Sequence, residues 1–128
     1  MKTKHQVLII GGGSGGIMTA AYMKRVNPKV DITIIEPSGD HYYQAAWTLV
    51  GAGTFNFEDT RRNESSVIPK GVMWIKDFAV KVVPEENKVI TKDSGEHIYD
   101  FLVVTPGLIM DLDAMPGLRE ALKTDSVC

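Results

Sequence analysis

The segment VLIIGGGSGG, residues 7–16, limits the possible folds more than any other part of the sequence. It places five glycines among six positions, directly after four apolar residues. Glycine contributes no side chain to a core and loses more backbone entropy on folding than any other residue. Such a run is therefore typical of a place where the backbone turns sharply or approaches another group closely. The apolar residues before it predict a buried strand over residues 6–10.

The residues after the glycines predict a helix and then a second strand. Residues 17–26 contain helix formers, with apolar residues at helical spacing. Asn27-Pro28 ends this segment, because the residue before a proline resists helical geometry. The β-branched run VDITIIEP, residues 30–37, follows as the second strand. A strand, a helix and a strand over this length form a βαβ unit with a right-handed crossover.

The glycines fit the pattern G-x-G-x-x-G at Gly11, Gly13 and Gly16. In a dinucleotide-binding turn the first glycine allows the tight turn, the second lets a pyrophosphate approach, and the third lets the helix pack close to the strand. The helix start and the Ser14 hydroxyl would face the phosphates. Glu36 closes the second strand and is placed to accept hydrogen bonds from a ribose. The alternative is a glycine-rich turn beside an incidental acid, and the motif does not separate FAD from NAD.

The rest of the chain predicts further strands and little additional helix. We expect residues 38–66 to be mostly irregular, because their aromatic residues follow no clear period. Three β-rich runs separated by turn residues predict an antiparallel meander. The expected elements are a short helix near 45–50, a third strand at 71–76, meander strands at 79–83, 88–92 and 96–100, a buried strand at 100–107, and a short helix at 118–123.

Composition excludes several classes of function. The 128 residues suffice for one domain, and with 23% charged residues and a net charge of −2 they include no basic run that would indicate a nucleic-acid partner. The one cysteine, Cys128, excludes an internal disulfide and a CxxC pair. His5, His41 and His97 lack metal-site spacing, so no metal is expected. No apolar run reaches the roughly 20 residues of a membrane helix, and we expect a cytoplasmic protein.

Four stretches, QVLIIGGGSGG, HYYQAAWTLVGAG, VIPKGVMWIK and YDFLVVTPGLIMD, together resemble the N-terminal part of sulfide:quinone oxidoreductases. The resemblance runs over residues 5–128 and implies that residues 1–128 are the N-terminal part of an FAD/NAD(P)-binding domain. The meander and the Thr105-Pro106-Gly107 turn are similar to those of glutathione-reductase-like flavoproteins. The expected fold class is therefore α/β: a Rossmann-like FAD-binding βαβ unit with a parallel sheet and a three-stranded antiparallel meander, incomplete in this chain.

The resemblance implies FAD as cofactor, with sulfide and a quinone as substrates of a longer enzyme. In such enzymes a pair of cysteines oxidises sulfide, electrons pass through the flavin to a quinone, and the sulfur leaves as persulfide or polysulfide. That pair would lie beyond this chain, and Ala45 stands where the family usually has proline. The implied FAD-binding residues are Gly11, Gly13, Ser14, Gly15, Gly16, Glu36, Ala45, Ala79, Thr105 and Gly107.

Several alternatives remain open. Cys128 is interpreted as a spectator, or as an auxiliary redox or flavin-proximal cysteine, but not as one of the sulfur pair. The rival functions are a type II NADH:quinone oxidoreductase, the flavin subunit of a flavocytochrome c sulfide dehydrogenase, and an FAD-binding module without catalysis. The full-length form is expected at the inner membrane as a peripheral protein, attached through a C-terminal part absent from this chain. The sheet of this chain would lack a strand that the longer relatives supply from later in their sequence. An unpaired sheet edge favours association, so we expect the chain to associate with itself or with a second chain that supplies the missing strand.

Three further groups of residues are weighed in the same way. His41 is interpreted as a hydrogen-bonded structural histidine, with a place near the flavin as the alternative. Asp111 and Asp113 are interpreted as solvated loop acids rather than a catalytic pair. The aromatic side chains near His41 are core residues or cofactor contacts with equal support; they are Tyr42, Tyr43 and Trp47.

Overall fold

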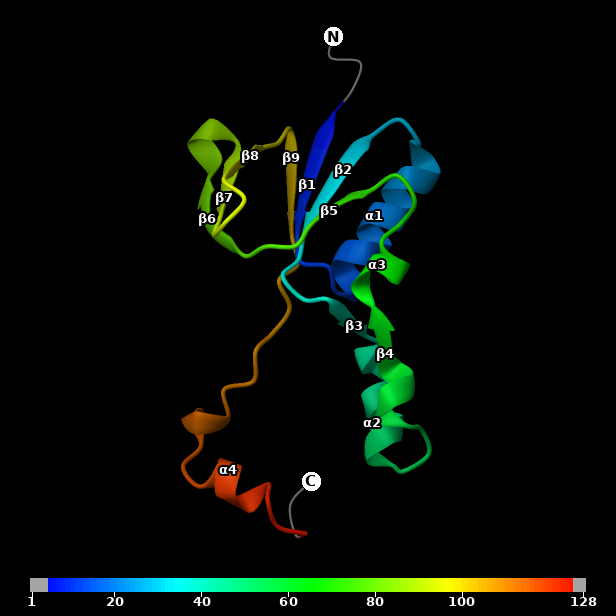
Figure 1. Ribbon diagram of the computed structural model, residues 1–128, viewed down its shortest axis with the longest axis vertical. Coiled ribbons are helices and arrows are strands. Elements are labelled where there is room, and N and C mark those ends of the chain that lie inside the picture. The colour runs from blue at the N-terminus through cyan, green and yellow to red at the C-terminus, as the bar shows by residue number, and fades with distance from the viewer. Residues whose placement is uncertain (1–4, 126–128) are drawn as a thin grey trace.

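A four-stranded parallel sheet forms the centre of the protein, which a computed structural model describes from residue 5 to residue 125 (Figure 1). The strands lie in the order β5–β2–β1–β9, and every neighbouring pair is parallel. Helix α1 joins the first two strands and makes the crossover of the predicted βαβ unit. The bounds are β1 Gln6–Ile10, α1 Ser14–Val26, β2 Asp31–Ile35, β5 Met73–Ile75 and β9 Phe101–Val104.

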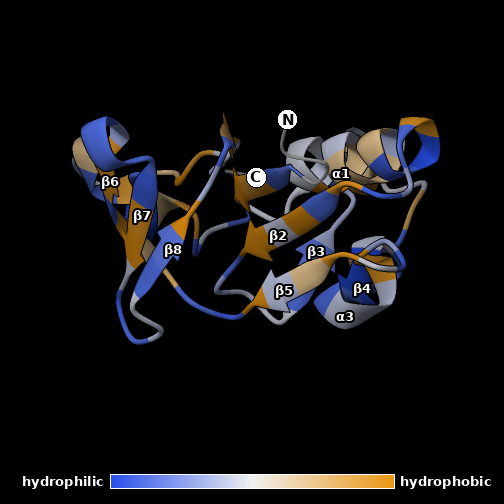
Figure 2. Cartoon of the chain, turned by 90° about the horizontal axis from the view of Figure 1, so that it is seen from above, coloured by the Kyte–Doolittle hydropathy of each residue, from blue (hydrophilic) through white to orange (hydrophobic). Residues whose placement is uncertain are grey.

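The central strands of this sheet are buried on both faces, which explains why they are mostly apolar. Alternate residues of a strand point to opposite faces. On one face, Val7 and Ile9 pack with Ala20 of α1. On the other face, Leu8 packs with Val89 of the antiparallel meander. Figure 2 shows α1 and the meander on opposite sides of the sheet, so the fold has three layers. The predicted α/β fold with a parallel sheet and an antiparallel meander is confirmed.

The antiparallel meander consists of three strands in the order β6–β7–β8. Asn87 adopts the left-handed conformation between the first two strands, with φ of 50°. Gly95, with φ of 85°, occupies the turn between the second and third. Asparagine and glycine are the residues that tolerate this conformation best. The bounds are β6 Ala79–Val83, β7 Lys88–Thr91 and β8 Glu96–Ile98, close to those predicted.

The segment expected to be mostly irregular contains an antiparallel strand pair that the sequence did not predict. Strands β3 and β4 pair through three residues each, and their side chains are mostly polar, so they show no alternating pattern. Helix α2 overlaps the short helix expected near 45–50. Helix α1 begins three residues earlier than predicted, since its first turn contains glycines. The bounds are β3 Asp40–Tyr42, α2 Trp47–Gly51, β4 Arg61–Asn63, α3 Glu64–Val67 and α4 Leu118–Ala121.

Within residues 5–125, no helix has both the length and the apolar composition needed to cross a membrane.

Asp77 ties the meander to the end of the parallel sheet. This 4% exposed residue lies between β5 and β6. Its Oδ2 accepts the backbone N–H groups of Asp93 and Ser94 at 2.9 and 2.7 Å, and its Oδ1 accepts that of Phe78 at 2.7 Å. Burial raises the pKa of Asp77, but these hydrogen bonds outweigh burial and hold the pKa well below its usual value.

Replacing this carboxylate should weaken the fold in a pH-dependent way. A carboxyl whose pKa is lowered by folding stabilises the protein above the unfolded-state pKa near 4, and this contribution is lost as pH falls toward the folded-state value. We therefore expect Asp77→Asn to unfold at lower urea concentration than the wild type at pH 7, with the difference narrowing by pH 3. Glu85→Gln, at an exposed carboxyl, is the matched control. If Asp77→Asn and the wild type differed in urea midpoint by the same amount at pH 7 and pH 3, the stabilising role of the Asp77 carboxylate would be contradicted.

Candidate functional site

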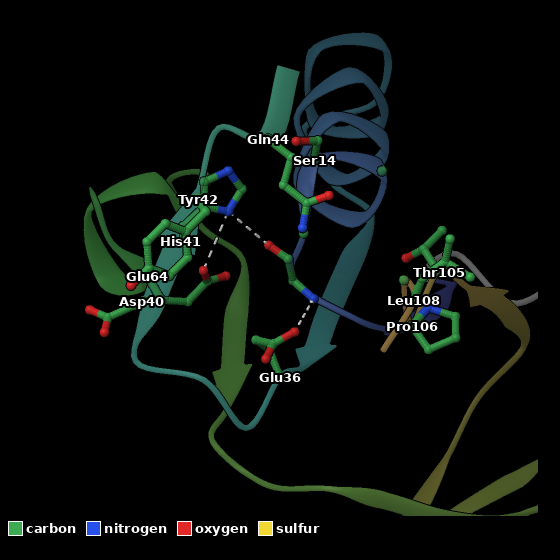
Figure 3. Close-up of a pocket in the computed structure, with 14 residues that line it drawn as sticks. Ser14, Glu36, Asp40, His41, Tyr42, Gln44, Glu64, Thr105, Pro106 and Leu108 are labelled. Atoms are coloured by element: carbon green, nitrogen blue, oxygen red, sulfur yellow. Dashed lines mark hydrogen bonds and ion pairs between the residues drawn. The ribbon is translucent and has the colours of Figure 1, made fainter. Parts of the chain in front are cut away.

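A cavity of about 480 Å³ opens at the carboxyl ends of β1, β2 and β9 (Figure 3). Its wall comes from four places: the glycine turn that leads into α1, Glu36 after β2, the β3–β4 region, and the segment 105–108 after β9. The carboxyl edge of a parallel sheet is the usual ligand site in open α/β folds. The volume lies within the range of about 300–1,000 Å³ typical of small-molecule sites.

Two glycines at the base of this cavity are required by close backbone contacts. Gly11 has φ of +100°, and a Cβ there would overlap the carbonyl of Thr105. A Cβ on Gly16 would overlap the carbonyl oxygen of Gly11. A hydrogen bond holds Thr105 at this position, since its N–H donates to the carbonyl oxygen of Ile10 at 2.8 Å. The structure therefore agrees with the tight turn predicted at Gly11 and the close helix packing predicted at Gly16.

Gly13 differs from these two glycines because it faces open space. Apart from the adjoining backbone, no atom of the described residues lies within 4 Å of the position where its Cβ would be. It is the N-cap residue of α1, and no side chain caps this helix end. The first N–H groups of a helix lack partners within the helix and carry a partial positive charge. Gly13, Ser14 and Gly15 all line the cavity, so this end of α1 is open to an anionic group.

Glu36 is held firmly beside the glycine turn. Its Oε2 accepts the N–H of Gly12 at 2.7 Å, and its Oε1 accepts the N–H of Ser38 at 2.7 Å. The Trp74 indole N–H donates to the Glu36 carbonyl at 2.9 Å. Each carboxylate oxygen has a second lone pair, so Glu36 retains the capacity to accept hydroxyl groups from a ligand in the cavity.

Glu64 is a buried acid of the site that the sequence reasoning missed. It is 1% exposed, and its Oε2 lies 3.5 Å from His41 Nδ1. Its Oε1 has no hydrogen-bond partner among the described residues. Burial raises the pKa of Glu64, the neighbouring His41 lowers it, and Glu36 raises it again, with a net increase. The only local signal was Asn63, which caps the short helix that begins at Glu64.

His41 is hydrogen-bonded, as interpreted from the sequence, and it also lines the cavity. Its Nδ1 lies 3.2 Å from the carbonyl oxygen of Gly12. Tyr42 lines the cavity too, and its ring stacks on Phe57 at 5.5 Å between centroids. Tyr43 is 59% exposed. Gln44, which the sequence reasoning did not single out, is a further lining residue.

The structure brings most of the predicted residues together. Two of them are placed elsewhere: Ala79 begins β6 and packs against the sheet, and Ala45 is not part of the cavity wall, although its neighbour Gln44 is. Asp113 pairs with Arg119 at an exposed site, in keeping with its interpretation as a loop acid. The prediction for Cys128 lies outside the described residues. The predicted residues on the cavity wall are Gly13, Ser14, Gly15, Glu36, Thr105 and Gly107, with Gly11 and Gly16 directly behind them.

Within the described residues, no three His, Cys, Asp or Glu side chains come close enough to hold a metal ion.

Comparison with known proteins agrees with this geometry. Residues 5–127 match the family described as pyridine nucleotide-disulphide oxidoreductase. The chain belongs to this family. It is 44% identical over 128 residues to the mitochondrial sulfide:quinone oxidoreductase of Dictyostelium discoideum, a match that covers 99% of this chain and 28% of that protein. The chain thus spans little more than a quarter of the length of this relative.

Two further relatives of the pyridine nucleotide-disulphide oxidoreductase family place the chain more finely. The crystal structure of the sulfide:quinone oxidoreductase from Aquifex aeolicus is 30% identical with a TM-score of 0.74, covering 84% of this chain and 25% of that one. The type II NADH:quinone oxidoreductase of Staphylococcus aureus is 25% identical over 120 residues, covering 91% of this chain and 30% of that protein. The resemblance to sulfide:quinone oxidoreductases is therefore confirmed, with the NADH enzymes more distant.

The family and its sulfide:quinone oxidoreductase relatives are FAD-dependent flavoproteins, in agreement with the predicted cofactor. The cavity fits such a dinucleotide on three observations. Gly13 leaves space where a side chain would stand. The N-terminus of α1 has no side-chain cap. Glu36 lines the same cavity and keeps free acceptor capacity for the hydroxyl groups of a ligand.

The contrast between Gly13 and Gly16 gives a test of the site's construction. We expect Gly16→Ala to destabilise the protein strongly, by about 1–3 kcal/mol or more, since the added methyl overlaps backbone that cannot move aside. Gly13→Ala should destabilise the protein much less, because its methyl enters open space and only the weaker N-cap preference of alanine is felt. Chemical denaturation followed by circular dichroism measures both. Equal destabilisation by the two substitutions would contradict the assignment of Gly16 to a close backbone contact and of Gly13 to open space.

Proposed function

We propose that this chain is the FAD-binding portion of a sulfide:quinone oxidoreductase. The observation that carries the proposal is that the open N-terminus of α1 at Gly13 and the carboxylate of Glu36, which accepts the Gly12 N–H, line one cavity. A helix N-terminus suits a diphosphate, and a carboxylate suits ribose hydroxyl groups. The identity to sulfide:quinone oxidoreductases over nearly the whole chain supports the choice of enzyme.

We assign a role to each part of the cavity wall. The N–H groups at the start of α1, with the Ser14 hydroxyl, donate hydrogen bonds to the diphosphate. Glu36 accepts hydrogen bonds from the ribose of the adenosine, which orients that half of the ligand. Residues 105–107 come close to the dinucleotide from the end of β9, where Gly107 has φ of +73°. Ala45 and Ala79 are assigned to the flavin and adenine sides through their backbone, on the strength of the resemblance.

Bound FAD supplies two-electron redox chemistry, which the protein directs by binding and orientation. In the longer enzyme the proposed reaction oxidises sulfide to persulfide or polysulfide sulfur and reduces a quinone. The chain has one cysteine, Cys128, so the cysteine pair for sulfide oxidation would come from outside these 128 residues. Cys128 is proposed at most as an auxiliary cysteine near the flavin.

Association and location remain predictions from the sequence. Strand β9 has β1 as its one neighbour in the sheet, and Phe101 and Val104 on it are each more than half exposed. Such an edge favours pairing with another strand, which supports the predicted self-association of this chain. The full-length enzyme is proposed to be peripheral to the inner membrane on the cytoplasmic side, where it would reach its quinone.

The binding proposal predicts the effect of neutralising Glu36. We expect the 128-residue chain to bind FAD weakly, and Glu36→Gln to lower the affinity about tenfold or more, because hydrogen bonds to charged groups contribute about 1.5–3 kcal/mol. Quenching of flavin fluorescence during titration measures the affinity. Glu120→Gln, at an exposed acid of α4, is the matched control, and thermal melts confirm folding. Unchanged affinity of Glu36→Gln would contradict the ribose assignment.

The enzymatic proposal is tested on the longer protein that contains this chain. We expect its flavin absorbance to bleach with sulfide and to return when a quinone is added. Bleaching by NADH but not by sulfide would instead indicate a type II NADH:quinone oxidoreductase, and reoxidation by a cytochrome rather than a quinone would indicate a flavocytochrome c sulfide dehydrogenase subunit. The 128-residue chain should turn over no sulfide, as expected of a binding module, and quinone reduction by this chain alone would refute that.

A further inference from the structure

The wall of the cavity carries an unusual charge distribution for a site that receives an anion. Three carboxyl groups line it, from Glu36, Asp40 and Glu64, and no lysine or arginine among the described residues does. The helix end opposite them offers only partial positive charge. One lining side chain, His41, is able to become a full cation. A diphosphate bound in this cavity would therefore lie near one side chain that can become a cation, His41, and near three acidic side chains.

The contacts of His41 determine which ring nitrogen carries a hydrogen. Nδ1 lies 3.2 Å from the carbonyl oxygen of Gly12 and 3.5 Å from Oε2 of Glu64 (Figure 3). A carbonyl oxygen only accepts hydrogen bonds, so Nδ1 keeps its hydrogen in the neutral ring as well as in the cation. Nε2, on the side of the ring away from Glu64 in Figure 3, is then the nitrogen that gains and loses a proton.

Glu64 provides the second half of this arrangement. The residue is 1% exposed, and its Oε1 has no hydrogen-bond partner in the described chain. A buried carboxylate with one free oxygen is stable only beside a positive group, or when it takes up a proton itself. The raised pKa of Glu64, caused mainly by burial and opposed by His41, fits this description. Two groups this close titrate as a pair rather than independently.

The other charges near the pair are already engaged. Glu36 accepts the N–H groups of Gly12 and Ser38. Asp40 forms an ion pair with Arg61 at 2.9 Å. Arg62 lies opposite His41 in the β3–β4 register, and its guanidinium donates to backbone carbonyls. Neither arginine lines the cavity, so a positive charge inside it depends on the proton of the His41–Glu64 pair.

We propose that His41 and Glu64 act as one positioning unit, which fixes the Gly12–Gly13 peptide and holds the proton that balances a bound diphosphate. This inference rests on the proposed binding of FAD. The peptide bond is planar and trans, so fixing the Gly12 carbonyl on His41 directs the Gly13 N–H to the opposite side. A diphosphate favours the protonated pair, so FAD binding takes up a proton and the affinity falls as pH rises.

Titrations of FAD into the 128-residue chain between pH 6 and pH 8.5 test this proton linkage. We expect the wild-type affinity to fall about tenfold across this range, the size of one added charge interaction at a partly exposed site. Glu64→Gln should show a smaller pH dependence, since only one group of the pair can then take up a proton. The double variant His41→Asn/Glu64→Gln, which keeps a donor for the Gly12 carbonyl, should bind with little pH dependence.

His97→Asn is the matched control, because His97 contacts Thr91 in the meander and does not line the cavity. Its pH dependence should equal that of the wild type. A flat wild-type profile, or a double variant that keeps the wild-type slope, would overturn the inference while leaving FAD binding intact. Absence of FAD binding at every pH would instead contradict the proposed function.

Nuclear magnetic resonance of the FAD-free protein gives a second readout that does not depend on the ligand. The ¹⁵N shifts of the His41 ring should show the Nδ1–H form when the ring is neutral. The ring shifts of His41 should change in Glu64→Gln, because the ring loses a carboxylate 3.5 Å from Nδ1. An Nε2–H ring, or identical ring shifts in the two proteins, would overturn the positioning unit whether or not FAD binds.

Discussion

The close approach of three backbone segments, at Gly11, Gly16 and Thr105, is the constraint on which the rest of the structure depends. A side chain at either glycine would overlap main-chain atoms. Because Gly11 and Gly16 have no side chains, the end of β1, the start of α1 and the end of β9 can lie in contact at one point. The same meeting point forms the floor of the cavity, so the packing of the sheet and the shape of the binding site have one common origin.

Three buried or partly buried carboxyl groups in this chain are stabilised in different ways. Asp77 receives three backbone N–H groups and has a lowered pKa. Glu36 receives two and remains open to the cavity. Glu64 has an imidazole near one oxygen and, within residues 5–125, no hydrogen-bond partner on the other, and its pKa is raised. The number of hydrogen-bond donors around each carboxyl thus distinguishes Asp77, which stays charged and holds the fold together, from Glu64, whose charge depends on the groups near it.

Much of the fold and part of the site could be predicted because the relevant signals are local. The strands around Leu8 and Ile34 are buried on both faces, so their sequences are mostly apolar. The turn at Gly11 follows from the glycine pattern. The β3–β4 pair and Glu64 could not be found in this way, since three-residue polar strands carry no periodicity. The burial of Glu64 depends on His41 and Gly12, which are distant in sequence.

The order of the strands has a consequence for how the chain folds. Strand β1 is a central strand, yet one of its two neighbours, β9, follows it in the sequence by more than 90 residues, as in the pairing of Val7 with Phe101. Contacts between such distant segments are slow to form, because a long loop must close first. During synthesis on the ribosome, β1 therefore cannot pair with β9 until almost the whole of this chain has emerged. Until then, the backbone N–H and C=O groups along one edge of β1 remain unpaired.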